Sequence, residues 1–165
     1  MKADTIHLGR YTVPNDRGVV VFLIGIRFNG WRGLATALRT FLKMPPMLAE
    51  LEREPALGLL DSRVALSWPV IAITQYWRSF DDLERFASSP DHSHAPAWRW
   101  FNRLGESKSS GVGIYHETYG VAPGAYEAIY GNMPRFGLAR ALDGHHRIAG
   151  RGEARARERA SAIGG

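Results

Sequence analysis

The sequence predicts an α+β domain whose elements follow one another as strand, helices, strand, strand, helices, strand. Two runs rich in β-branched and aromatic residues, 19–28 and 70–77, are typical of β-strands. Apolar residues recur at helical spacing over 34–42 and 79–87. Alternation over 111–119 predicts the strand that completes this order. With 165 residues the chain is long enough for one domain with a substantial core.

The first half of the order is bounded by turn residues and prolines. An Asn-Gly pair ends the strand 19–28, and the helix over 34–42 follows. A Met-Pro-Pro sequence breaks this helix, and Pro46 suits the first turn of a second helix that contains Leu51. Pro55 ends the second helix, so the connection between the first two strands contains two helices.

The second half begins with two strands, 57–68 and 70–77, that are joined tightly. Ser79 and Asp82 have the spacing of an N-terminal cap, which predicts that a helix begins there. Pro96 fits the first turn of a further helix, and a polar loop leads from that helix to the closing strands. Together with the first half, this order is βαββαβ, which is the ferredoxin-like arrangement.

The closing strands bring a histidine into an apolar row. In the alternation over 111–119, His116 shares a face with Val112 and Ile114, whereas Glu117 falls on the opposite face. We therefore expect His116 to point inward and Glu117 to form an ion pair or a dimer contact. A Pro-Gly turn separates this strand from another predicted at 125–130.

The predicted domain occupies residues 18–138, with an N-terminal arm at 1–17 and a basic, flexible tail at 139–165. The net charge of +5 is concentrated near the end, because residues 135–165 hold seven arginines and three acidic residues. The rest is nearly neutral, so we expect no nucleic acid as a partner of the domain. Contact between the arginine tail and nucleic acid is a weaker alternative.

Composition excludes several classes of function. Hydrophobic residues make up 45% and charged residues 22%, which indicates a globular protein. The absence of cysteine excludes disulfides, thiolate catalysis and cysteine-ligated zinc. No apolar run reaches the roughly 18 residues that a membrane span needs, and the N-terminus lacks the apolar core of a signal peptide. We therefore expect a cytoplasmic protein with no membrane contact.

Helices on one face of such a sheet leave the second face without cover. In a monomer that face would be a large exposed apolar surface. Burial of sheet against sheet around a two-fold axis removes this exposure. The sequence therefore predicts a homodimer formed through the β-sheet.

Four stretches resemble a known family: VVVFLIGIRFNGW at 19–31, QYWRSFDDLERFA at 75–87, HAPAWRWFNR at 94–103 and GIYHETYGVAPGAYEAIYGNMP at 113–134. They are similar to small bacterial and fungal monooxygenase-like proteins of the dimeric α/β-barrel superfamily. The likeness spans roughly residues 10 to 138. It implies a dimeric α/β barrel with a pocket between sheet and helices, and oxygen chemistry on an aromatic or polyketide-like substrate.

The same resemblance implies either no cofactor or haem b. Some members of the superfamily oxidise electron-rich phenols without a cofactor, using a general base in an apolar pocket. Others bind haem through a histidine on a helix. His94 lies in the region where haem-degrading relatives place that ligand, although Pro96 stands where their helix is continuous.

The candidate catalytic residues are His116 and His94, because an imidazole can move a proton near neutral pH. The alternative is a purely structural role: His116 would be a core histidine with one hydrogen bond, and His94 would cap a helix. Aromatic and amide side chains near the predicted pocket suit a flat hydrophobic substrate, and most aromatics in a domain also serve packing. The candidate substrate-binding residues are Tyr76, Trp98, Phe101, Asn102, Tyr130 and Asn29.

No metal site is predicted. Asp91, His92 and His94 with His116 contain the residue types of a two-histidine, one-carboxylate site. Their proline-flanked loop lacks the rigidity that such a site needs, so we do not assign one.

Two functions from different classes follow. The leading hypothesis is a monooxygenase-type oxidoreductase in which a histidine deprotonates a hydrophobic, aromatic or polyketide-like substrate and the anion reacts with O₂. The alternative is a haem-binding barrel, either a haem-dependent oxygenase or dehydratase, or a barrel that binds a small molecule without catalysis.

Overall fold

The computed structural model of the protein describes residues 5–14, 16–42, 49, 51, 53–89, 100, 103–106 and 111–148. The chain forms two compact units: Met1–Val19 with Gly120–Gly165 is the first, and Val20–Tyr119 is the second. Most of the helices predicted after Pro46 and Pro96 lies outside the described residues. Leu51 and Leu104, which belong to those two segments, are helical and buried.

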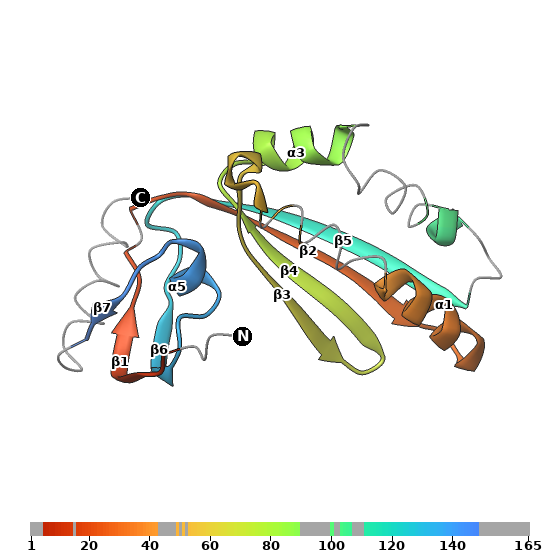
Figure 1. Ribbon diagram of the computed structural model, residues 1–165, viewed down its shortest axis with the longest axis horizontal. Coiled ribbons are helices and arrows are strands. Elements are labelled where there is room, and N and C mark those ends of the chain that lie inside the picture. Colours follow the sequence, from red (N-terminus) through yellow and green to blue (C-terminus); the bar gives the residue numbers. More distant parts are fainter. Residues whose placement is uncertain are drawn as a thin grey trace. The chain divides into compact units, whose positions relative to one another are not determined.

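The second unit contains a four-stranded sheet in the order β3-β4-β2-β5 (Figure 1). Its strands are β2 (Val19–Phe28), β3 (Leu59–Ser67), β4 (Val70–Trp77) and β5 (Val112–Val121). Helix α1 (Trp31–Phe41) follows β2, and α3 (Phe80–Ser88) follows β4. The first and third strands of the βαββαβ order are therefore central, which confirms the ferredoxin-like α+β fold predicted from the sequence.

Both helices cover the same face of this sheet. β2 pairs antiparallel with β4, and Phe22 faces Gln75 while Ile24 faces Ile73. Residues paired in this way point to the same side. Two core clusters join this side of the sheet to the helices. The first packs Leu83 and Phe86 of α3 against Val20, Phe22, Ile24, Ile73 and Trp77. The second packs Ala37 of α1 against Ile26, Phe28 and Val112.

The start of α3 is held by the cap that the sequence predicts. Ser79 Oγ accepts a hydrogen bond from the Asp82 backbone N–H at 3.1 Å and donates one to Asp82 Oδ2 at 2.9 Å. Arg78 and Arg85 form ion pairs with the two oxygens of the same carboxylate, at 2.8 and 2.9 Å. The hydrogen bond from Arg78 is the main reason that the pKa of Asp82 is lowered to about 2, although burial acts in the opposite direction.

Helix α1 is seated by a close contact at Gly33. A Cβ atom at this position would lie 1.8 Å from the carbonyl oxygen of Gly111, just before β5. The same carbonyl accepts a hydrogen bond of 2.9 Å from the backbone N–H of Asn29. Glycine is therefore required for α1 to approach the point where β2 ends and β5 begins.

The first unit contains a three-stranded sheet in the order β6-β1-β7. Its elements are β1 (His7–Thr12), β6 (Ile129–Met133), the short helix α5 (Leu138–Ala141) and β7 (His146–Arg147). Tyr11 and Tyr130 are paired in the register and stack with ring centroids 5.0 Å apart. Tyr11 is almost completely buried, and it packs with Val13 and Ala139.

This unit corrects the sequence predictions for both ends of the chain. The arm predicted at 1–17 contains β1, and the first part of the tail predicted at 139–165 forms α5 and β7, whereas residues 149–165 lie outside the described residues. The strand predicted at 125–130 is shifted to 129–133 and joins β1 instead of the main sheet. β1 shows little apolar alternation because only Tyr11 and Thr12 of its six residues are buried.

Within the part of the chain that the structure describes, none of the helices has the length and apolar character needed to cross a membrane.

Replacing Asp82 with Asn is expected to lower the free energy of unfolding by about 1–2 kcal/mol at pH 7, the range typical of a lost helix cap and weak ion pairs. The folded-state pKa of about 2 lies below the ordinary value of 3.8, so the stabilisation is present above the ordinary value and is lost as the pH falls through the folded-state pKa. Urea unfolding at a series of pH values should show this acid loss in the wild type and not in Asp82→Asn.

The exposed neighbour provides a matched control for this measurement, because Asp81 lies in the same turn of α3. At pH 7, Asp81→Asn should change the unfolding free energy much less than Asp82→Asn does. An equal decrease of the unfolding free energy in Asp81→Asn and Asp82→Asn would contradict a specific role of the Asp82 carboxylate.

Replacing Gly33 with Ala is expected to destabilise the protein by about 1–3 kcal/mol, because the added methyl group must displace backbone atoms and not only a side chain. Thermal or urea unfolding measures the change. Gly120→Ala is the matched control, since a Cβ atom at Gly120 meets nothing within 4 Å. Unfolding curves that coincide for wild type and Gly33→Ala would show that the approach of α1 to Gly111 is not required.

Candidate functional site

A row of side chains crosses the helix-facing side of the four-stranded sheet. Ser62 of β3 is paired with Gln75 of β4, and Gln75 is paired with Phe22 of β2. On the next strand, β5, the His116 ring lies 5.9 Å from the ring of Phe22. Ser62, Gln75, Phe22 and His116 therefore follow one another across all four strands, and we refer to them as the central row.

The amide of Gln75 is fixed within this row. Gln75 is 3% exposed, and its Oε1 accepts a hydrogen bond of 3.0 Å from the indole N–H of Trp77, which is fully buried. A primary amide whose oxygen is held in this way can still donate through its NH₂ group. A buried amide donor beside apolar residues is an arrangement that can orient an oxygen atom of a bound molecule.

His116 lies on the predicted face but is exposed, which corrects the expectation that it is buried. β5 is buried only at its start, at Val112, and residues 115–120 are exposed in the single chain. The helices contact the sheet near the N-terminal end of β5, where Val112 and Ile114 belong to the core clusters. His116 lies farther along the strand. The alternation of a strand determines which face a side chain occupies, but the length of the covering helices determines its burial.

Two of the predicted substrate-binding residues lie on the opposite face of the sheet. None of the helices among the described residues covers this face, and we call it the helix-free face. Tyr76 is paired with Val21 and accepts a hydrogen bond of 2.9 Å from Arg63, whose guanidinium also lies 5.6 Å from the centre of the Tyr76 ring. Asn29 follows the end of β2 and accepts a hydrogen bond from Arg27. Neither residue shares a face with His116.

The same helix-free face carries a tyrosine that packs flat against the sheet. A Cβ atom at Gly25 would lie 2.4 Å from the Tyr115 ring, so the ring occupies the space that a side chain at Gly25 would fill. Tyr119, farther along β5, donates a hydrogen bond of 2.6 Å to Glu117, and this bond raises the pKa of Tyr119. Glu117 thus lies on the face opposite His116, as its position in the strand predicts.

The remaining predicted site residues are not brought together. Tyr130 belongs to the first unit, where it stacks on Tyr11. His94, Trp98, Phe101 and Asn102 lie outside the described residues. Among the residues that are described, no three His, Asp or Glu side chains form a group that could hold a metal ion.

Sequence reasoning missed Gln75 and Ser62 as site residues. The available signal was a polar residue inside the strongly apolar strand VIAITQYW, because a buried glutamine in such a strand needs a partner. The partner, Trp77, lies two residues away on the same face of the strand. For Ser62 the signal was absent, since its place in the row depends on the register shift between Leu59 and Asp61.

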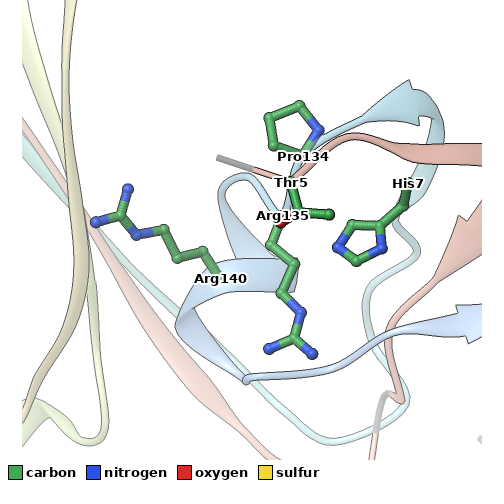
Figure 2. A pocket seen from close by; sticks show the side chains of 5 residues that line it. All are labelled: Thr5, His7, Pro134, Arg135 and Arg140. Atoms are coloured by element: carbon green, nitrogen blue, oxygen red, sulfur yellow. The ribbon is translucent and has the colours of Figure 1, made fainter. Parts of the chain in front are cut away.

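A second polar site lies in the first unit, where Thr5, His7, Pro134, Arg135 and Arg140 line a cleft of about 470 Å³ (Figure 2). The His7 ring lies 4.3 Å from the ring of His145. Partial desolvation lowers the pKa of His145, and the positive charges of His7, Arg135 and two further neighbours lower it further. The surroundings of this cleft are therefore electropositive.

Comparison with known proteins agrees with the fold and places the chain in a family. The architecture defines a ferredoxin-like α+β protein. Residues 19–138 match the model of the Monooxygenase af470-like family, and the chain belongs to this family. It is 28% identical over 159 residues to monooxygenase af470 of Aspergillus fumigatus, an alignment that covers 88% of this chain and 50% of the relative. The chain therefore spans about half the length of the curated relative that it matches.

Two solved structures are similar to this chain at low sequence identity. An aldoxime dehydratase in complex with butyraldoxime superposes with a TM-score of 0.50 and 13% identity, over 84% of this chain and 43% of that one. A dimeric ferredoxin-like protein from an uncultured marine organism has a TM-score of 0.45 and 14% identity, over 66% of this chain and 91% of that one. The likeness to the dehydratase concerns the fold alone.

Proposed function

We propose that this protein is a monooxygenase-type oxidoreductase that acts on a hydrophobic small molecule, aromatic or polyketide-like, bound against the central row between the sheet and the helices. The observation that carries the proposal is the central row itself, in a chain that belongs to the Monooxygenase af470-like family. The row combines an imidazole and a buried amide with the aromatic ring of Phe22 and the hydroxyl of Ser62. These groups match a reaction that starts with loss of a proton from an apolar substrate.

In the proposed reaction His116 accepts the first proton. The proton comes from a methylene group or a ring carbon that a phenol activates. An imidazole can remove this proton when the resulting anion is delocalised over the aromatic system. The anion then donates electrons to O₂. For a methylene carbon the balance is R₂CH₂ + O₂ giving R₂C=O + H₂O: two C–H bonds break, one oxygen atom enters the product and the other leaves as water. The substrate supplies all the electrons, so no external reductant is needed.

Gln75 stabilises the same anion from the neighbouring part of the row. Its NH₂ group can donate to the substrate oxygen on which negative charge develops, and the hydrogen bond from Trp77 holds the amide in place beforehand. Because Gln75 is buried, its dipole is not screened by bulk water. Phe22 lies between Gln75 and His116 and offers an aromatic surface to the substrate ring.

Haem is the alternative cofactor chemistry. An imidazole is a suitable axial ligand, and bound haem would supply oxygen activation or dehydration chemistry. The histidine that the resemblance implies as ligand, His94, lies outside the described residues. An absorption spectrum of the purified protein separates the alternatives: a Soret band that disappears in His94→Ala supports haem, and its absence supports the cofactor-free reaction.

We further propose that the protein forms a homodimer through the helix-free face of the sheet. This face carries Val21, Leu23, Ala72 and Tyr115 and is covered by neither α1 nor α3. Half-buried aliphatic residues and a flat tyrosine are typical of a surface that packs against a second sheet. Such packing would cover these side chains with a second copy of the chain.

Replacing His116 with Ala is expected to lower kcat/KM for O₂ consumption at least 100-fold, the usual contribution of a general base. An oxygen electrode measures the rate with a panel of tricyclic phenols that carry an activated methylene group, and mass spectrometry identifies the product. His146→Ala, in the first unit, is the matched control and should retain the wild-type rate. Wild-type activity in His116→Ala would exclude His116 as the base.

Replacing Leu23 with Glu is expected to convert the dimer into a monomer, because a charge in the centre of the proposed interface would lose its hydration. Sedimentation velocity measures the mass of each species. Leu66→Glu is the matched control, since Leu66 is 71% exposed and lies on the opposite face of the sheet. A wild-type protein that sediments as a monomer at micromolar concentration would contradict the proposed interface.

A further inference from the structure

Helix α1 turns small residues toward the core and large apolar residues toward solvent. Gly33, Ala37 and Thr40 are buried. Four large residues of the helix and its C-terminal cap are exposed, at intervals of three or four positions: Trp31, Leu34, Leu38 and Leu42. Residues at this spacing share one side of a helix, which in a domain surface helix normally faces the core. α1 thus presents an apolar stripe to solvent, and Trp31 at its start is 87% exposed.

The contacts on the buried side of α1 fix this orientation. Gly33 allows the close approach to the Gly111 carbonyl. The hydroxyl of Thr40 donates a hydrogen bond of 2.8 Å to the Thr36 carbonyl and accepts one of 3.1 Å from the indole N–H of Trp100. A rotation of the helix that buried the apolar stripe would break these contacts, so the stripe stays exposed in the single chain.

The turn between β3 and β4 adds two exposed apolar residues on the same side of the sheet. Leu66 of β3 is paired with Ile71, and Ile71 is paired with Ile26, which belongs to the core cluster under α1. The ring of Trp68 lies 5.4 Å from that of Phe28, a member of the same cluster. Leu66 and Trp68 are both mostly exposed. Figure 1 shows α1 and this turn at the same end of the sheet, and we call the stripe together with Leu66 and Trp68 the apolar patch.

The charged residues that accompany the apolar patch are basic. Residues 17–49 contain no aspartate or glutamate, and their basic residues include Arg32 and the exposed Arg39 of α1. Residues 62–80, which include the β3–β4 turn, also contain no acidic residue. The helical residues 103–106, whose Leu104 packs with α1, carry one arginine and one glutamate and leave this balance unchanged.

This charge discriminates between the surfaces that could cover the apolar patch. A second copy of the chain would bring the same positive charge to the contact, and like charges repel. An anionic surface would attract it. A helix with tryptophan and leucine on one side and arginine beside them is typical of segments that lie in the interface of an anionic bilayer. Tryptophan suits the depth of the lipid headgroups, because its ring is apolar and its N–H is polar.

We propose that the apolar patch binds the protein to the surface of an anionic lipid bilayer, with α1 lying among the headgroups and its leucines directed toward the acyl chains. The expectation of no membrane contact concerned a spanning segment, which a helix on the bilayer surface does not need. The inference does not depend on the proposed monooxygenase reaction, because none of the patch residues belongs to the central row.

Flotation of the full chain with lipid vesicles tests the proposal. One set of vesicles contains phosphatidylcholine alone, and the other contains phosphatidylcholine with about one third phosphatidylglycerol. We expect binding to the anionic vesicles and at least tenfold weaker binding to the neutral ones. Leu38→Glu should weaken binding to the anionic vesicles at least tenfold, because it removes apolar area from the stripe and adds a negative charge. Arg39→Gln should weaken it about fivefold, the usual contribution of one basic residue near such a surface.

Leu8→Glu is the matched control, because Leu8 is an exposed leucine of β1 in the first unit. It should leave binding to the anionic vesicles within twofold of the wild-type value, and Arg10→Gln serves in the same way for Arg39→Gln. A urea unfolding curve verifies that Leu38→Glu remains folded.

Four results would overturn the proposal. The first is absence of binding to either kind of vesicle, and the second is equal binding to both kinds. The third is unchanged binding in Leu38→Glu, which would assign the attraction to another basic part of the chain such as the arginine-rich residues 149–165. The fourth is a lower mass of Leu38→Glu than of the wild type in sedimentation velocity, which would assign the apolar patch to a second copy of the chain.

Discussion

The antiparallel pairing of β2 with β4 determines most of what this protein can do. The two strands pair continuously from Val20 with Trp77 to Arg27 with Val70, without a register shift. Each pair assigns two side chains to one face of the sheet, so one register decides the composition of both faces. A slip by one residue would move Phe22 and Ile24 out of the core and bring Arg27 into it. The large burial of apolar surface under α1 and α3 makes such a slip unfavourable.

This register separates two chemically different surfaces. The helix-facing side presents the central row, in which burial decreases from Gln75 toward His116. The buried amide of Gln75 is shielded from water, whereas the imidazole of His116 is reached by solvent, so these two polar groups of the row lie in different environments. The helix-free side instead carries Tyr76, Arg63 and Tyr115, whose contacts with one another and with the sheet suit packing.

The first unit shows how a segment that is basic in sequence becomes part of a fold. Arg135, Arg140 and Arg147 belong to the arginine-rich end of the chain, yet Arg135 lies just before α5, Arg140 lies in α5 and Arg147 lies in β7. What orders them is the aromatic core formed by Tyr11 and Tyr130 together with hydrogen bonds to backbone carbonyls. The electropositive cleft is thus a consequence of where the strands bring these arginines, and the net charge alone does not reveal it.

The sequence by itself determined the element order, the α3 cap and the face of β5 that His116 occupies, because each depends on residues that are neighbours along the chain. It also determined the family, through stretches that resemble it. The tertiary structure alone decided that Gln75 and Ser62 share the row of His116, that Tyr76 lies on the other side, and that the predicted arm is a strand of a separate unit. These features depend on strand register and on pairing between residues more than 100 positions apart, such as Tyr11 with Tyr130. Local periodicity carries no information about such pairing, because the same alternation is compatible with any partner strand.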